Sequence, residues 1–109
     1  MKTQLQVTYR NMSPSAALEA EIREKAEKLE RFWDQTISCR VVLEAENHRH
    51  RHGNLYRVNL EIKVPDKEII AGRASDLHQA HDDVYVAIRD AFDSARRQLE
   101  DYNKRRQQL

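Results

Sequence analysis

The sequence has only one cysteine, two prolines and two glycines among its 109 residues. The single cysteine, Cys39, excludes an intrachain disulfide framework and a zinc site built from cysteines. Two glycines could hardly form a phosphate-binding glycine loop, and no such motif occurs. No apolar run approaches the ~20 residues of a transmembrane helix, and the first residues lack the apolar stretch of a secretory signal. We therefore expect a cytoplasmic domain.

Charge is abundant but balanced, with 19 basic and 18 acidic residues giving a net charge of +1. Any binding to nucleic acid must therefore come from the distribution of charge over the surface. One basic cluster is evident at the end of the chain, where Lys104-Arg105-Arg106 follows the last acidic residue, Asp101. The length and the hydrophobic content of 39% predict one domain with one core, over residues 1–109.

Alternating apolar and polar residues predict β-strands in the first two thirds of the chain. A turn over Asn47–Asn54, which contains Gly53, joins two of them into a long antiparallel hairpin. Pro65-Asp66 then turns the chain into a short final strand. The four expected strands cover residues 5–9, 37–45, 56–64 and 68–73.

Two helices are predicted from apolar residues at steps of three and four. Ser13 is the expected N-cap of the first helix, with Pro14 in its first turn. The second helix, over residues 85–102, has the strongest periodicity in the sequence. The residues expected to face the sheet are Leu18, Ile22, Leu29, Trp33, Ile88, Phe92 and Leu99.

The predicted order β-α-β-β-β-α indicates an α+β fold that resembles a double-stranded-RNA-binding domain. A right-handed crossover makes the first two strands parallel, so the four-stranded sheet is mixed. Each strand has one apolar face, so both helices should pack on the same side of the sheet. The solvated face would carry Gln4, Gln6, Thr8, Arg40, Arg57, Asn59, Glu61 and Lys63.

No residue pattern indicates catalysis or a cofactor. The acidic side chains lie at i,i+4 spacing from basic ones, which is typical of weak ion pairs on a helix surface. Cys39 falls on the inward side of a strand and is interpreted as a small core residue. The expected helix pairs are Glu21–Lys25, Glu24–Lys28, Glu27–Arg31, Arg96–Glu100 and Glu100–Lys104.

The hairpin turn has an unusual composition. In an extended chain the three histidines of this stretch would share one face and its two arginines the other. Three interpretations remain open: a solvated turn, an auxiliary contact to nucleic acid, or a metal site. We favour an RNA contact over a metal site. The stretch is His48, Arg49, His50, Arg51 and His52.

Basic side chains also lie beside the apolar stripe of each predicted helix. In the second helix, Asp93 and Glu100 share their face and would neutralise part of it. Charge alone therefore favours a solvated, salt-bridged surface. The basic residues are Lys25, Lys28 and Arg31 in the first helix, and Arg89, Arg96, Arg97 and Lys104 in the second.

Motifs in both helices change that interpretation. Asp83-Val84-Tyr85-Val86-Ala87-Ile88, followed by Arg96-Arg97-Gln98-Leu99, resembles the signature of the ribosome hibernation-promoting factors, also called ribosome-associated inhibitors or protein Y. Lys25-Ala26-Glu27-Lys28-Leu29-Glu30, with Phe32 as the following aromatic residue, is similar to the first-helix motif of that family. The fold of the family has the same element order.

The resemblance implies a protein without enzymatic activity or cofactor that binds ribosomal RNA in the small subunit's channel for messenger and transfer RNA. It would block translation there by its bulk. Lys25, Lys28 and Arg97 have direct counterparts in the family, whereas Arg31, Arg96 and Lys104 are inferred from helical geometry. Arg89, Arg105 and Arg106 complete the expected RNA-binding set.

Two other classes of function remain possible from the sequence. One is an RNA-binding or protein-interaction module that does not act on the ribosome, such as a dimer formed through an exposed sheet edge. The other is a metal-responsive protein that uses the histidines of residues 48–52. No membrane and no small-molecule substrate are expected as partners.

Overall fold

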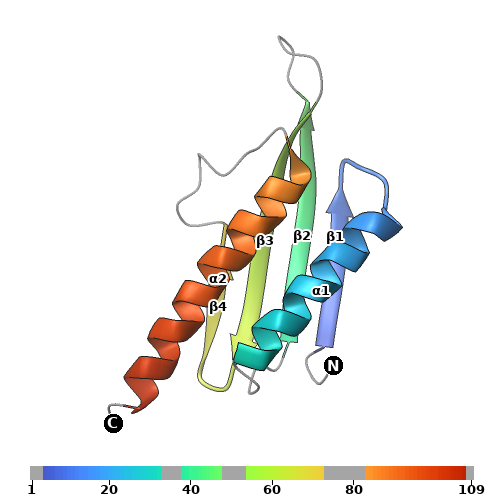
Figure 1. The fold of residues 1–109 in the computed structure, drawn as a ribbon. Coiled ribbons are helices and arrows are strands. Elements are labelled where there is room, and N and C mark those ends of the chain that lie inside the picture. Colours follow the sequence, from blue (N-terminus) through green and yellow to red (C-terminus); the bar gives the residue numbers. More distant parts are fainter. Residues whose placement is uncertain (1–3, 33–37, 48–53, 73–82, 108–109) are drawn as a thin grey trace.

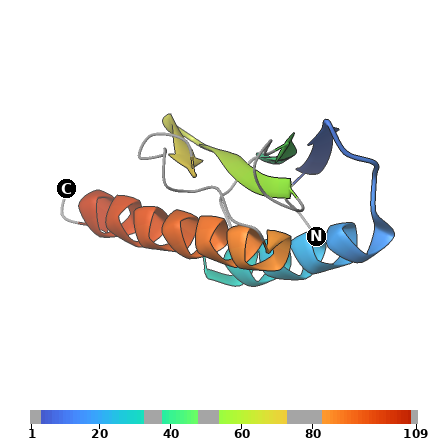
Figure 2. The same cartoon turned by 90° about the horizontal axis from the view of Figure 1, so that it is seen from above.

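The computed structural model describes residues 4–32, 38–47, 54–72 and 83–107. Within them it confirms the predicted order of elements and the α+β fold class. Both helices cover the same face of the sheet (Figures 1 and 2). The elements are β1 (Gln4–Arg10), α1 (Ala16–Phe32), β2 (Ser38–Asn47), β3 (Asn54–Val64), β4 (Lys67–Ala71) and α2 (Val84–Gln107).

The four strands form one sheet in the order β1-β2-β3-β4. β1 pairs with β2 in parallel, and the β2–β3 and β3–β4 pairs are antiparallel, as predicted. The β2–β3 hairpin is longer than expected at both strands, because pairing continues to Asn47 opposite Asn54. β4 ends earlier than expected, at Ala71. Gly72 follows with a φ of 86°, which takes the backbone out of the strand.

The observed N-cap of α1 differs from the predicted one. The helix begins at Ala16, and its N-cap is Ser15 instead of Ser13. The Leu18 amide donates to Ser15 Oγ at 3.2 Å, and the Glu19 amide donates to the Ser15 carbonyl oxygen at 3.0 Å. The Tyr9 hydroxyl of β1 also donates to that carbonyl oxygen, so a contact from the sheet fixes where the helix starts.

The core lies between the sheet and the two helices. The predicted inward residues Leu18, Ile22, Leu29, Ile88, Phe92 and Leu99 are all buried, and Trp33 lies outside the described residues. Inward residues of β2, β3 and β4 close the core from the other side, including Val41, Leu60 and Ile69. α1 contacts β1 and α2, whereas α2 packs over β3 and β4. The two helices run side by side in the same direction (Figure 1).

Candidate functional site

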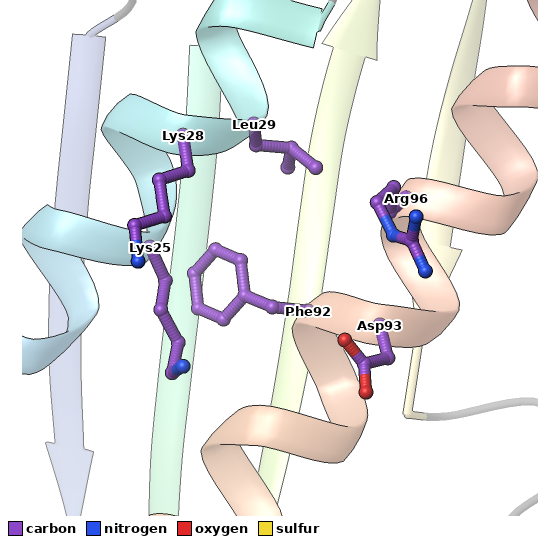
Figure 3. Close-up of a pocket in the computed structure, with 6 residues that line it drawn as sticks. All are labelled: Lys25, Lys28, Leu29, Phe92, Asp93 and Arg96. Atoms are coloured by element: carbon purple, nitrogen blue, oxygen red, sulfur yellow. The ribbon is translucent and has the colours of Figure 1, made fainter.

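A groove of about 150 Å³ lies between the two helices on the side away from the sheet (Figure 3). We call it the interhelical groove. Its rim is cationic and its floor is apolar, with one carboxylate beside the floor. Lys25 and Lys28 reach it from α1, and Arg96 reaches it from α2. The remaining lining residues are Leu29, Phe92 and Asp93.

Helical spacing explains how these side chains converge. Lys25 and Leu29 lie four residues apart on α1, and Phe92 and Arg96 lie four apart on α2, so each pair shares a helix side. Because the helices are parallel neighbours, the two sides face each other (Figure 3). Leu29 and Phe92 are buried, as the apolar stripe predicts, yet they also form the floor of the groove.

The two lysines of the groove form the ion pairs that the sequence predicts. Lys25 Nζ lies 3.4 Å from Glu21, and Lys28 Nζ lies 3.3 Å from Glu24. The Lys28 side chain is 65% exposed, so its ion pair contributes little to stability. A phosphate group could therefore replace Glu24 as the partner of Lys28 at little energetic cost.

The other three predicted helix pairs are wrong. Within the described part of the chain, no ion pair joins Glu27 to Arg31, or Glu100 to Arg96 or Lys104. Spacing of i,i+4 permits such pairs, but exposed side chains gain little by forming them. Arg31, Arg96 and Lys104 thus have no acidic partner among the described residues.

The remaining predicted RNA-binding residues lie outside the groove. Arg97 and Lys104 are exposed on α2, and Arg31 is exposed on α1. The Arg89 guanidinium donates to the neighbouring Asp90 carboxylate at 3.1 Å. The side chain of Arg106 and residues 48–52, with His48, Arg49, His50, Arg51 and His52, lie outside the described residues.

Arg105 faces a different part of the molecule. It lines a depression beside β4 together with Lys67 and Tyr102, on the side of α2 away from α1. The basic end of the chain is therefore divided, because Lys104 and Arg105 are neighbours in sequence but point about 100° apart on a helix.

The outer face of the sheet differs from the helix face in its charge. Arg40 lies 3.8 Å from Glu61, and Arg57 is hydrogen-bonded to Glu46 across the β2–β3 pair. These cross-strand pairs neutralise much of the face that the sequence predicts to be solvated. Most cations without an ion-pair partner among the described residues lie instead on the helices, where unpaired acidic side chains such as Glu27, Asp93 and Glu100 lie among them.

The described residues offer little for catalysis or metal binding. Cys39 is 3% exposed, and burial raises the pKa of its thiol to about 12, so it is no nucleophile at neutral pH. No group of three or more metal-ligating side chains gathers among the described residues. In that same part of the chain, neither helix has an apolar stretch long enough to cross a bilayer.

Asp93 is the residue whose place the sequence does not predict. Helical periodicity assigns it only a neutralising role on the basic face, whereas the structure places it in the lining of the groove. It is exposed and forms no hydrogen bond or ion pair with another described residue. Its i,i+3 spacing from Arg96 is a signal that could have located it, because side chains three residues apart share a helix face.

Known sequences resemble this chain over most of its length. The family described as "Sigma 54 modulation protein / S30EA ribosomal protein" matches residues 5–107. A curated protein of Deinococcus radiodurans, named ribosome hibernation promotion factor, is 31% identical over 100 residues. Those residues make up 92% of this chain and 49% of the relative, so the chain spans about half the length of that protein. The matches confirm the resemblance found in the two helix motifs.

Solved structures share the fold. A ribosomal subunit interface protein from Coxiella burnetii superimposes with a TM-score of 0.76 at 18% identity, covering 94% of this chain and 99% of that one. The N-terminal domain of Thermus thermophilus Protein Y gives a TM-score of 0.68 at 20% identity, with the same two coverages. At these identities the likeness shows the architecture alone.

Proposed function

This chain belongs to the Sigma 54 modulation protein / S30EA ribosomal protein family, and from that premise we propose that it binds the small ribosomal subunit through ribosomal RNA. It occupies the channel used by messenger and transfer RNA and so blocks translation sterically. The name of the Deinococcus relative, ribosome hibernation promotion factor, supports this proposal. So does the convergence of cations from both helices on the interhelical groove.

The observation that carries the proposal is the meeting of cations from both helices. Lys25, Lys28 and Arg96 converge on one groove, and Arg97 and Lys104 extend the positive surface along α2. Two parallel helices with such a surface suit the RNA backbone, because lysine and arginine contacts to phosphate read shape and charge without reading sequence. No bond is made or broken, and no cofactor is needed.

The low net charge of the chain makes its affinity for RNA depend on local contacts. With a total of only +1, attraction at long range is weak, and affinity depends on local phosphate contacts. Each contact releases counterions from the RNA, so affinity falls as salt rises. For about five phosphate contacts, binding should weaken on the order of 10²-fold between 50 and 200 mM salt.

Sedimentation with purified ribosomal subunits tests the proposal. The chain should pellet with small subunits in low salt and be released as salt rises, and it should pellet poorly with large subunits. Added to a cell-free translation reaction, it should lower protein synthesis in proportion to the occupied small subunits. Equal binding to both subunits, or binding without salt dependence, would contradict the proposal. Either result would favour a module that does not act on the small-subunit channel.

A further inference from the structure

A groove that bound only phosphate would gain nothing from its carboxylate. Asp93 lies beside Arg96 in the lining, and its negative charge opposes a phosphate held by Lys25, Lys28 and Arg96 (Figure 3). The carboxylate oxygens have no hydrogen-bond donor among the described residues. They are therefore open to accept hydrogen bonds from a ligand.

The floor of the groove indicates what kind of ligand that is. Leu29 and Phe92 supply an apolar floor, and the Phe92 ring lies between the two helices (Figure 3). Because Phe92 is 5% exposed, only a small part of its ring is available for contact with a ligand. A groove of about 150 Å³ admits the six-membered ring of a base, which carries the Watson–Crick edge, while the rest of the nucleotide stays outside. Unpaired RNA bases are commonly recognised by stacking on aromatic side chains combined with hydrogen bonds to their edges.

We propose that the interhelical groove receives one unpaired guanine of ribosomal RNA and that Asp93 recognises it. The base lies against Leu29 and Phe92. Its N1–H and N2–H groups donate to the two carboxylate oxygens of Asp93. Lys25, Lys28 and Arg96 hold the phosphates on either side of this nucleotide. The inference rests on the proposed function and adds a base-specific contact to it.

Guanine is preferred over the other bases because of the hydrogen-bond donors on its Watson–Crick edge. Its Watson–Crick edge carries two adjacent N–H donors, which match the two oxygens of a carboxylate, whereas adenine and cytosine each offer one amino group there beside an acceptor nitrogen. That acceptor would face a carboxylate oxygen and repel it. A matched bidentate contact of this kind typically discriminates between bases by about tenfold or more.

Nucleotide titration followed by NMR tests the groove directly. GMP should shift the amide signals of residues 92–96, and AMP and CMP should bind about tenfold more weakly. A single-stranded pentanucleotide with one central guanine should bind more tightly than GMP, because the flanking phosphates add contacts. If GMP binds as tightly as the pentanucleotide, the ligand is a free guanine nucleotide and the RNA assignment is wrong. Equal binding of the three mononucleotides, or no binding of any, would overturn the proposal.

Substitution of Asp93 distinguishes two roles of this residue, which either neutralises the groove or accepts hydrogen bonds from guanine. The two roles predict opposite changes in affinity for small subunits. Asp93→Asn removes a negative charge, so it should strengthen binding to small subunits if Asp93 only neutralises the groove. If Asp93 accepts from guanine, the same change should weaken ribosome binding about tenfold. It should also turn the nucleotide preference toward AMP, because an asparagine amide pairs with adenine. Asp101→Asn, an exposed change of equal charge on the same helix, is the matched control.

Failure of the inference and failure of the proposed function give different results. If the wild type binds small subunits and Asp93→Asn binds as well as Asp101→Asn, the guanine contact is wrong and the proposed function stands. If the wild type does not bind small subunits, the proposed function is wrong, and the assignment of a ribosomal guanine falls with it.

Discussion

The hydroxyl of Tyr102 donates a hydrogen bond to Asp66 Oδ1 at 2.6 Å, joining α2 to the turn between β3 and β4. Tyr102 is 5% exposed, and Lys67 Nζ lies 5.9 Å from the centre of its ring. Gln98 Nε2 donates to the Ile70 carbonyl oxygen at 3.1 Å one turn earlier. These contacts fix the second half of α2 over β4 and so set the direction of the helix that carries Arg96 and Arg97.

Loss of the Tyr102 hydroxyl should therefore lower stability. Tyr102→Phe keeps the ring but removes a hydrogen bond to a carboxylate, so the free energy of unfolding should fall by about 1–2 kcal/mol. The melting temperature should fall by about 4–8 °C for each kcal/mol. Tyr85→Phe is the control, since Tyr85 is 47% exposed and its hydroxyl has no partner among the described residues. Equal melting temperatures for both variants would contradict this assignment.

Gly72 should not tolerate a side chain. Its φ of 86° is in the left-handed region, and an added Cβ would collide with the carbonyl oxygen of Val58 on the neighbouring strand. Gly72→Ala should cost about 2 kcal/mol or more in free energy of unfolding, because strain and collision add. Urea unfolding measures this loss. A change below about 0.5 kcal/mol would show that the end of β4 can adjust freely.

The buried thiol of Cys39 predicts a loss of stability at alkaline pH. Its pKa is about 12 in the folded protein, whereas an unfolded cysteine has a pKa near ~8.5. Above pH 8.5 the unfolded state loses this proton while the folded state keeps it, so stability falls as pH rises toward 12. By pH 10 the wild type should lose about 1–2 kcal/mol more than Cys39→Ala, relative to pH 7. Parallel curves for the two proteins from pH 7 to 10 would contradict burial of the thiol.

The histidines of residues 48–52 remain a prediction from the sequence. If they lie near phosphate, their protonation should strengthen ribosome binding as pH falls from about 7.5 to 6, because free histidine has a pKa of ~6.5. A variant with His48, His50 and His52 all changed to alanine should bind normally at pH 7.5 and lose the gain at pH 6. Binding of zinc with sub-micromolar affinity by the wild type would favour a metal site instead.

Periodicity predicts this fold well because each element buries one continuous face. The four-residue spacing of Leu18 and Ile22 predicts α1. The alternation of apolar and polar residues predicts the two strands of the hairpin. The N-cap could not be chosen in the same way, since Ser13 and Ser15 are equally suitable caps. The hydrogen bond from Tyr9, six residues earlier on β1, accompanies the cap at Ser15. The periodicity of apolar residues carries no information about such a contact.

The candidate site is predicted only in part for a related reason. Lys25 and Lys28 can be selected by motif and by helix face, but their meeting with Arg96 depends on how the two helices pack. Packing also places Arg105 beside β4 and brings Asp93 to the groove. The predicted pairs of Arg96 and Lys104 with Glu100 fail because a weak surface pair is permitted by spacing but not required by it.

Charge reversal on the two faces of the molecule tests the central claim most directly. One variant changes Lys25, Lys28 and Arg97 to glutamate, and the control changes Arg10, Arg40 and Lys63, which are exposed residues on the outer face of the sheet. Both variants change the net charge by the same amount, and both should keep nearly the melting temperature of the wild type, since exposed charges contribute little to folding. In sedimentation with small ribosomal subunits at low salt, the helix variant should lose binding by about a hundredfold or more, while the sheet control stays within about tenfold of the wild type. Equal loss of binding by both variants, or unchanged binding by the helix variant, would contradict the assignment of the helix face as the ribosome-binding surface.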